Sequence, residues 1–415
     1  MFERNPETAA VKIPARLAEV ADGLAAAVAV SLPWSTSATS ILVVLWLIAL
    51  VPTLDAASLR RELLSAAGGL PVLLWVLGAL GMAWADASWG ERIAGLSGFH
   101  KLLVIPLLLA QFRRSGRAQW VILGFLASSI VLLVVSWVLV LAPGLPWRGG
   151  RAVGVPVKDY ILQSAIFAIC AFGLIGRAAE LRRGRPRLAL GLLLLAGAFI
   201  ADVGYVATAR TTLVVMAVLL LLFGVRQFGF KGALGACLIG GALAGIAWGS
   251  SPYLRERVAP VVGQLQNYAA GDVTSVGLRL EYWTKSLGFI AEKPIVGQGT
   301  GTIPKLFRRE ATAGTDPMLI TDNPHNQILT VAVEIGLLGA VVLIALWTAH
   351  LALFCERTLI AWLGLVVVVQ NVVGSLFNSY LFDFSQGWLY VFGVGAIGGT
   401  VLHGARVPGR SEVVT

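Results

Sequence analysis

Residues 322–327, DNPHNQ, place side chains capable of acid–base chemistry at the start of a long apolar run. The imidazole of His325 has an ordinary pKa of about 6.5, so it can accept and return a proton near neutral pH. Either Asp322 or Asn323 is expected to cap the helix that follows, and Asn326 stands beside the histidine. A histidine at a helix start also has purely structural uses, so position alone leaves both interpretations open.

Two arginines occupy positions that favour binding an anion. Arg210 opens an apolar segment in ATARTTLVV, and Arg279 opens an amphipathic segment in GLRLEYWTKSLGF. An arginine that points into a membrane helix bundle costs about 2.5–3.5 kcal/mol on insertion scales and needs a partner. Its planar fork suits phosphate, to which it can donate two hydrogen bonds at once. Such a clamp beside a base predicts a group-transfer site.

The segment PWRGGRAVGVPVKD adds Arg148, Arg151 and Lys158. These three positive charges lie in a connection expected outside, and an external anion would complete them. Arg148 and Arg151 could equally bind lipid headgroups.

Two further features have a simpler expected role. Glu334 lies nine residues beyond the histidine, roughly 13 Å further along a helix, so a structural hydrogen bond is expected of it. The glycine-rich GQGTG at 297–301 predicts a turn, because a nucleotide-binding loop would need a strand before it and a helix after it. The chain contains three widely spaced cysteines and four histidines, which gives a metal site little support.

The composition predicts a membrane protein. Of the 415 residues, 57% are hydrophobic and only 13% are charged, whereas a soluble domain carries roughly 25% charged residues. Approximate apolar segments predict about twelve transmembrane helices. They lie at 17–33, 37–54, 63–85, 101–112, 119–142, 160–176, 188–207, 211–225, 232–249, 326–353, 358–377 and 387–403.

The distribution of arginine and lysine sets the expected orientation. Alternate connections are rich in basic residues, among them RAAELRRGRPR, and the positive-inside rule then places both termini in the cytoplasm. The chain is expected to divide into helices 1–9 over residues 1–249, a long periplasmic loop over 250–325, helices 10–12 over 326–403 and a cytoplasmic tail over 404–415. Within the loop, an amphipathic helix is expected to bury Leu280, Trp283, Leu287 and Ile290.

Three quoted motifs resemble the O-antigen ligase and polymerase superfamily. PHNQILTVAVEIGLLG is similar to its signature, in which a His-Asn pair precedes a span that contains Glu-x-Gly and a further glycine; here these are His325, Asn326, Glu334, Gly336 and Gly339. ATARTTLVV resembles the family's arginine-containing span start. RLEYWTKSLGFIAEKPIVGQGTG resembles the pattern of its long external loop.

The resemblance implies an all-α, polytopic glycosyltransferase of the GT-C type in the bacterial inner membrane. Such an enzyme takes a glycan from an undecaprenyl-diphosphate carrier on the periplasmic face and passes it to an acceptor hydroxyl. For a ligase the acceptor is a sugar of the lipid A core, and the product is lipopolysaccharide. No metal or other cofactor and no nucleic acid partner is expected; membrane lipids surround the protein.

Carried over to this sequence, the resemblance gives His325 the role of the base that activates or positions the acceptor hydroxyl. Arg210 and Arg279 would hold the diphosphate and stabilise the leaving group. Arg148, Arg151, Lys158 and Asn326 are assigned to substrate binding. Direct attack by the acceptor would invert the anomeric centre.

The motif is shared by the ligase, the O-antigen polymerase and the protein O-oligosaccharyltransferase. The ligase is favoured because the chain is compact, has one long outer loop and lacks an extended C-terminal external domain, which is an argument by analogy. A lipid-linked glycan or anion transporter is the alternative of a different class. Inverted repeats and paired broken spans would favour the transporter, and the polar residues instead gather at one expected face.

Overall fold

The structure, a computed structural model, describes residues 6–145, 147, 152–269, 274–311 and 317–404. Within these ranges the ordered elements are α-helices and short 3-10 helices without a strand, which confirms the predicted all-α class. The elements are α1 (Pro6–Ser31), α2 (Thr36–Leu50), η1 (Val51–Thr53), α3 (Ala56–Leu64), α4 (Ala66–Gly81), α5 (Trp89–Ser97), η2 (His100–Leu103), α6 (Val104–Arg114), α7 (Ala118–Leu141), α8 (Tyr160–Leu181), α9 (Pro186–Tyr205), α10 (Arg210–Ser250), α11 (Pro252–Val258), α12 (Pro260–Ala269), α13 (Ser275–Glu292), α14 (Ile303–Arg309), η3 (Pro317–Leu319), α15 (Gln327–Leu353), α16 (Leu359–Ser375) and α17 (Phe384–Gly404).

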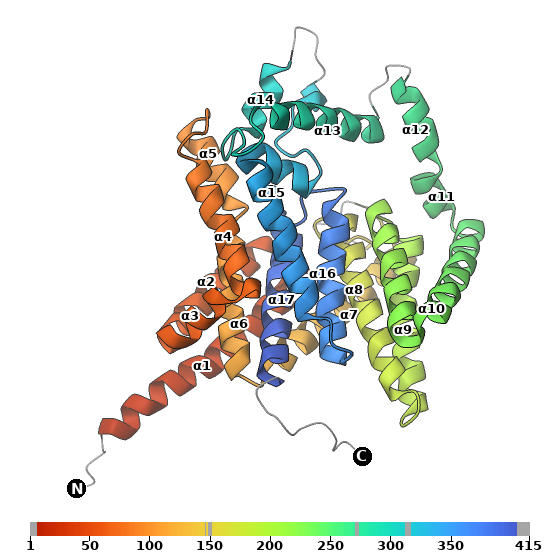
Figure 1. Cartoon of the computed structure of the whole chain (residues 1–415). Helices are drawn as coiled ribbons and strands as arrows, with labels where there is room; N and C mark the ends of the chain where they lie inside the picture. Colours follow the sequence, from red (N-terminus) through yellow and green to blue (C-terminus); the bar gives the residue numbers. More distant parts are fainter. Residues whose placement is uncertain (1–5, 146, 148–151, 270–273, 312–316, 405–415) are drawn as a thin grey trace.

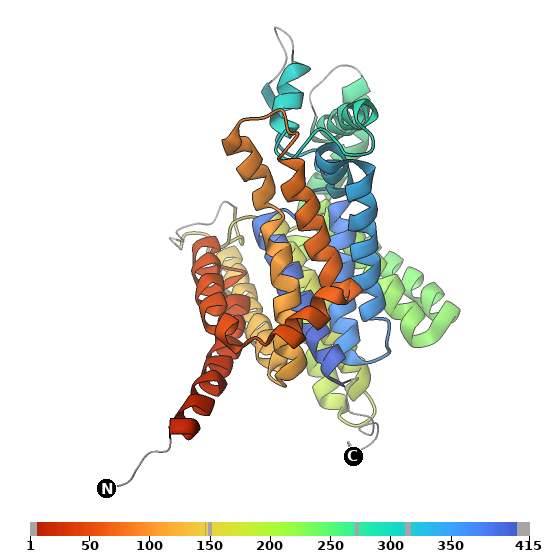
Figure 2. The same ribbon diagram turned by 60° about the vertical axis from the view of Figure 1, so that its left-hand side comes forward.

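The long helices form one bundle, with α4, α15, α16 and α17 running along its axis (Figures 1 and 2). Helix α6 packs along α17, α8 along α9, and α1 against both α2 and α7. Small residues let α6 and α17 approach closely: a Cβ on Gly395 would lie 2.3 Å from the Cβ of Leu108, and one on Gly399 would lie 2.7 Å from the Cβ of Phe112. Close packing of this kind holds helices together in a bilayer, where burial from water contributes little.

When helices are counted as transmembrane spans by their length and composition, fewer spans are found than the twelve predicted. Among the described residues, six helices are long and apolar enough to cross a membrane, or up to eight if the bent pairs α3–α4 and α5–α6 each count as one span. Every apolar segment predicted from the sequence falls on a helix, yet the count of twelve is not confirmed. The difference arises because several segments are short or bent.

Helix α10 combines two of the predicted segments, 211–225 and 232–249, in one element of 41 residues. It is broken at Gly229, which has φ 62°, a conformation that glycine adopts without steric cost. A Cβ on Gly232 would lie 1.9 Å from the carbonyl oxygen of Gly224, so the two halves contact each other directly beside the break.

Helix α15 is kinked near its start, and the segment 294–301 docks on the kink. Gly336 has φ 70°, and a Cβ there would lie 2.0 Å from the carbonyl oxygen of Ile295. The freed backbone is used: Gln298 N–H donates to Val333 O at 2.8 Å, and Gly299 N–H donates to Glu334 O at 2.8 Å. The GQGTG segment is therefore a turn, as predicted, and its function in the fold is to seat this segment against α15.

Helix α13 lies across the start of α15, as Figure 1 shows. We call this end of the bundle the cap end; the start of α1 and the end of α17 lie at the opposite end (Figure 1). The predicted helix within 250–325 is present, but its most buried apolar side chains are Leu278, Tyr282 and Phe289. The predicted buried stripe was wrong for Leu287, which is 59% exposed, because α13 turns its aromatic residues toward α14 and α15. The predicted division of the chain, and the assignment of this end to the periplasm, stay predictions.

Candidate functional site

His325 lies at the cap end, two residues before α15 begins. Its φ is 56°, and it is the only non-glycine residue with positive φ in the described ranges. Backbone of this kind costs on the order of 1–3 kcal/mol and persists where neighbouring contacts fix it. The side-chain oxygen of Asn323 supplies such a contact, accepting a hydrogen bond from the His325 backbone N–H at 2.9 Å. The strain is therefore held by a specific local contact.

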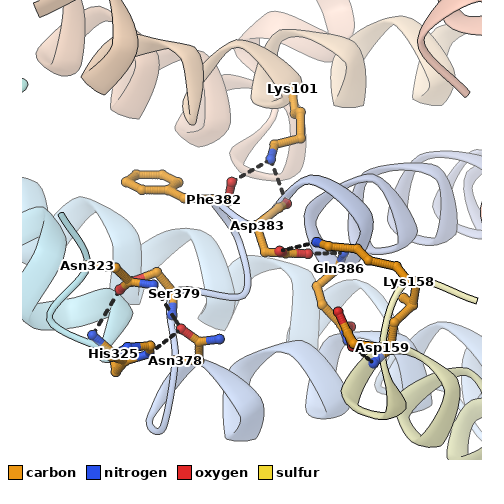
Figure 3. Close-up of polar contacts among 11 residues, drawn as sticks. Lys101, Lys158, Asp159, Asn323, His325, Asn378, Ser379, Phe382, Asp383 and Gln386 are labelled. Carbon is orange, nitrogen blue, oxygen red and sulfur yellow. Dashed lines mark hydrogen bonds and ion pairs between the residues drawn. The ribbon is translucent and has the colours of Figure 1, made fainter. Parts of the chain in front are cut away.

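The ring of His325 is oriented by Asn378 (Figure 3). His325 Nδ1 lies 2.9 Å from Asn378 Oδ1, and the same oxygen accepts from the backbone N–H of Ser379 at 2.9 Å. That backbone donor identifies the amide atom as the oxygen, which can only accept. His325 Nδ1 must therefore carry the proton, and in the neutral ring Nε2 keeps its lone pair. This is the tautomer that a general base requires.

The residues that hold Asn378 form a network around the loop 376–383. Asn323 Nδ2 donates to Asn378 Oδ1 at 2.9 Å, and Ser379 Oγ donates to Asn323 Oδ1 at 2.8 Å. Thr330 on α15 lies 2.8 Å from Ser379 through their hydroxyl oxygens. The loop is also anchored from the other side, where Lys101 Nζ donates to Phe382 O at 2.9 Å (Figure 3). The position of the histidine ring is thus fixed by several independent contacts.

The surroundings of the ring favour its neutral form. Tyr282 of α13 stacks on His325, with ring centroids 5.9 Å apart and an interplanar angle of 22°. Burial lowers the pKa of His325 below its ordinary value, and the positive charge of Arg279 lowers it further, although the hydrogen bond with Asn378 acts in the opposite direction. At neutral pH the imidazole is therefore mainly uncharged and able to accept a proton.

Three half-buried arginines interact with one another, and one of them, Arg279, also acts on His325. Arg210 begins α10 and donates from Nε to the carbonyl oxygen of Arg257 at 2.6 Å, and from NH1 to Gln264 Oε1 at 3.3 Å. The charge of Arg210 interacts with those of Arg257 and Arg279. Arg257 is further held over the ring of Tyr160, with its guanidinium carbon 4.3 Å from the centroid.

This arginine cluster, defined as Arg210, Arg257 and Arg279, is short of negative charge. In the described part of the chain, no carboxylate lies within ion-pair distance of any of the three. Like charges held together repel each other, and an anion bound between them removes that repulsion. The arrangement can therefore bind a multiply charged anion such as a diphosphate.

The remaining residues predicted for substrate binding have different positions. Lys158 pairs with Asp383, Nζ to Oδ2, at 3.4 Å (Figure 3). Asn326 caps α15: its Oδ1 accepts from the backbone N–H groups of Ile328 and Leu329, so the predicted cap at Asp322 or Asn323 was wrong. Substrate binding by Lys158 and Asn326 stays a prediction. Arg148 and Arg151 lie outside the described residues.

Glu334 has the structural contact that was expected of it. Its Oε1 accepts from the Gly301 backbone N–H at 2.8 Å, which ties α15 to the turn at 297–301. Among the described residues, no group of three or more His, Cys, Asp or Glu side chains could hold a metal ion.

Sequence reasoning missed Asn378, Ser379 and Tyr282. The signal for the first two was present in LFNSYLFDF, where polar side chains interrupt an apolar region between two helices. Their partner His325 lies more than fifty residues earlier, so only the fold reveals the pairing. Arg257 was not among the predicted site residues, and the structure places its backbone carbonyl against the guanidinium of Arg210.

A family profile described as O-antigen ligase matches residues 192–344. The matched segment contains Arg210, Arg257, Arg279 and His325, and it confirms the resemblance to the O-antigen ligase and polymerase superfamily. Members of that superfamily are glycosyltransferase-like enzymes that use lipid-linked glycans. No curated protein is significantly similar to the chain. Together with the long apolar helices, the match supports a membrane protein that is similar to this superfamily over residues 192–344.

Proposed function

We propose that the protein is an O-antigen ligase of the bacterial inner membrane. It transfers a glycan from undecaprenyl diphosphate to a sugar hydroxyl of the lipid A core, at a site on the periplasmic face, and so completes lipopolysaccharide. The family match to residues 192–344 supports the superfamily. The ligase is chosen over its relatives by analogy.

In the proposed reaction, His325 Nε2 accepts the proton of the acceptor hydroxyl as the oxygen attacks the anomeric carbon of the donor. The bond from that carbon to the diphosphate oxygen breaks, and the leaving group takes the electron pair. Direct displacement forms one glycosidic bond as the other breaks, so the anomeric configuration inverts. Proton transfer to a positioned base typically contributes about 10²–10⁴ in rate.

The arginine cluster is assigned to the diphosphate. Negative charge grows on the leaving oxygen during the reaction, and donors held in place beforehand stabilise it without reorganising. Arg210 and Arg279 supply these donors, and Arg257 supports Arg210 through its backbone carbonyl. Fixed guanidinium groups can neutralise a diphosphate by themselves, which is consistent with a reaction that needs no metal.

The observation that carries the proposal is the pairing of two features at one end of the bundle. His325 holds its Nδ1 proton against Asn378, which leaves Nε2 free as a base. The positive charge of Arg279 acts on the same histidine and also on Arg210. Transfer of a glycan from a diphosphate carrier requires a base for the acceptor hydroxyl and a cationic cluster for the diphosphate.

Reconstitution tests the proposal. The purified protein in lipid vesicles is supplied with a polyprenyl-diphosphate-linked glycan and, separately, with lipid A core, with a second carrier-linked glycan and with a pilin-type protein. Product on lipid A core alone is expected. Product on the second glycan would instead assign an O-antigen polymerase, and product on the protein an O-oligosaccharyltransferase.

A transport assay runs on the same vesicles. Movement of the labelled lipid-linked glycan between leaflets, without product on any acceptor, would refute the transferase and assign a transporter.

A further inference from the structure

A cavity of about 370 Å³ opens at the cap end, next to the histidine network. It lies between α5, the start of α14, the first turns of α15 and the loop 376–383. Its volume is at the small end of the roughly 300–1,000 Å³ range of ligand pockets. The cavity is lined by Glu91, Ala94, Gly95, Ser97, Gly98, Gly301, Ile303, Pro304, Asp322, Asn323, Thr330, Glu334, Asn378, Ser379, Phe382 and Asp383.

The lining of this cavity differs in charge from the arginine cluster. It contains four carboxylate side chains, two amides and several hydroxyls, and it contains neither lysine nor arginine among the described residues. Two of the carboxylates are neutralised from outside: Glu91 pairs with Arg308, and Asp383 pairs with Lys158. The other two, Asp322 and Glu334, have no ion pair in the described part of the chain. The unpaired Asp322 therefore repels a second anion, such as a phosphate.

One buried group in the lining lacks a complete set of partners. Glu334 is 4% exposed. Its Oε1 accepts from Gly301 N–H, while its Oε2 has no hydrogen-bond partner among the described residues. Glu334 lines the cavity, so this second oxygen is available to accept a hydrogen bond from a ligand hydroxyl. The cavity thus offers a free acceptor to a molecule that carries O–H groups.

The cavity shares two of its walls with the histidine. Asn323 and Asn378 line it, and both are hydrogen-bonded to His325 at 2.9 Å. No member of the arginine cluster lines it. His325 itself does not line the cavity, but it is joined to the cavity wall through these two asparagines, and the charge of Arg279 acts on it as well.

We propose that this cavity is the acceptor subsite, and that it binds an uncharged sugar ring while excluding a phosphorylated one. The carboxylates, amides and hydroxyls are suited to accept and donate hydrogen bonds to a neutral polyol, and Phe382 supplies an apolar wall. The bound sugar gives up one hydroxyl proton to His325 as that oxygen attacks the donor. The inference rests on the proposed function, which it deepens by assigning the acceptor its own site and charge.

The first test fills the cavity. Ala94 lines the cavity from α5 and is exposed, so the phenyl ring of Ala94→Phe can extend into the cavity without a steric clash in the helix packing. The neighbouring Ile93 is 59% exposed and does not line the cavity, which makes Ile93→Phe the matched control. With reconstituted full-length protein, Ala94→Phe is expected to raise KM for an unphosphorylated lipid A core at least about tenfold. The donor KM should stay as in the wild type, and Ile93→Phe should change neither value.

The second test concerns charge. Two lipid A cores are offered, one with a neutral terminal sugar and one with a phosphate on that sugar. The wild type is expected to use the neutral core at least about tenfold better by kcat/KM, and Asp322→Asn should reduce that ratio by roughly tenfold because one repelling charge is gone.

The outcomes separate the two proposals. An acceptor KM unchanged in Ala94→Phe, or equal use of both cores by the wild type, would overturn the acceptor subsite while the transferase stands. Absence of transfer by the wild type with every acceptor would overturn the proposed function. Equal loss of activity in Ala94→Phe and Ile93→Phe would show damage to α5. Calorimetry then decides, by comparing the affinity of Asp322→Asn for the delipidated neutral core oligosaccharide with the affinity of the wild type for the phosphorylated form. Equal affinities would also overturn the subsite.

Discussion

The contact between His325 and Asn378 gives the sharpest prediction, made with the substitution Asn378→Asp. The change keeps the shape of the side chain and an oxygen at 2.9 Å from His325 Nδ1. The Nδ2 atom that it removes makes no hydrogen bond in the described structure, so the main change is from a neutral amide to a negatively charged carboxylate. The variant therefore places one negative charge directly against the proposed base.

The magnitude follows from that distance. An opposite charge within about 4–6 Å typically shifts a pKa by 1–3 units in favour of the charged form. Burial holds the pKa of His325 below its ordinary 6.5 in the wild type, so the ring is mainly neutral at pH 7. A rise of about 1–3 units increases the fraction of protonated ring at pH 7, so kcat/KM should fall at that pH, about tenfold for each unit by which the new pKa exceeds the pH.

The sign of the pH dependence is fixed by the role of a base. A base works unprotonated, so activity is lost as pH falls through its pKa. In the wild type the acid limb should lie below pH 6.5. In Asn378→Asp it should move upward by about 1–3 units, and activity should recover at high pH.

The assay is the pH profile of kcat/KM in the reconstituted transfer reaction, with both substrates below saturation. Asn378→Ser is the control, because it removes the amide without adding a charge beside the histidine. Its acid limb should lie at or below that of the wild type, because the hydrogen bond that raises the pKa of His325 is weakened. An unmoved limb in Asn378→Asp, with folded protein, would show that the histidine hydrogen-bonded to Asn378 is not the base.

Three further outcomes are expected. His325→Ala should abolish transfer while the protein stays in the membrane, and normal product formation by that variant would exclude a catalytic histidine. Arg210→Lys should lower kcat/KM at least about tenfold in the same assay, because one ammonium cannot both hold Arg257 O and clamp a phosphate bidentately; wild-type turnover would mean that charge alone suffices. Gly336→Ala should lower the thermal unfolding temperature, with a cost on the order of 1–3 kcal/mol or more, because its φ is 70° and its Cβ would meet Ile295 O; an unchanged midpoint would contradict the docking of 294–301.

The sequence determined the class of protein and several of its chemically important residues. Long apolar segments can satisfy their backbone only as helices in a membrane, and all of the predicted segments fall on helices. A histidine at 325 and an arginine at 210, each at the start of such a segment, predicted a functional site at that end of the helices. These conclusions depend on local composition and spacing, and both can be read directly from the sequence.

Only the tertiary structure decided which residues meet. Asn378 fixes the protonated nitrogen of His325 from 53 positions away, and Arg257 joins Arg210 from 47 positions away. The stripe that α13 buries and the residue that caps α15 also differ from their predictions, because neighbouring elements select the face and the cap. Hydrogen bonds and charge interactions depend on distances in space, and a pattern of residue types along the chain does not specify those distances.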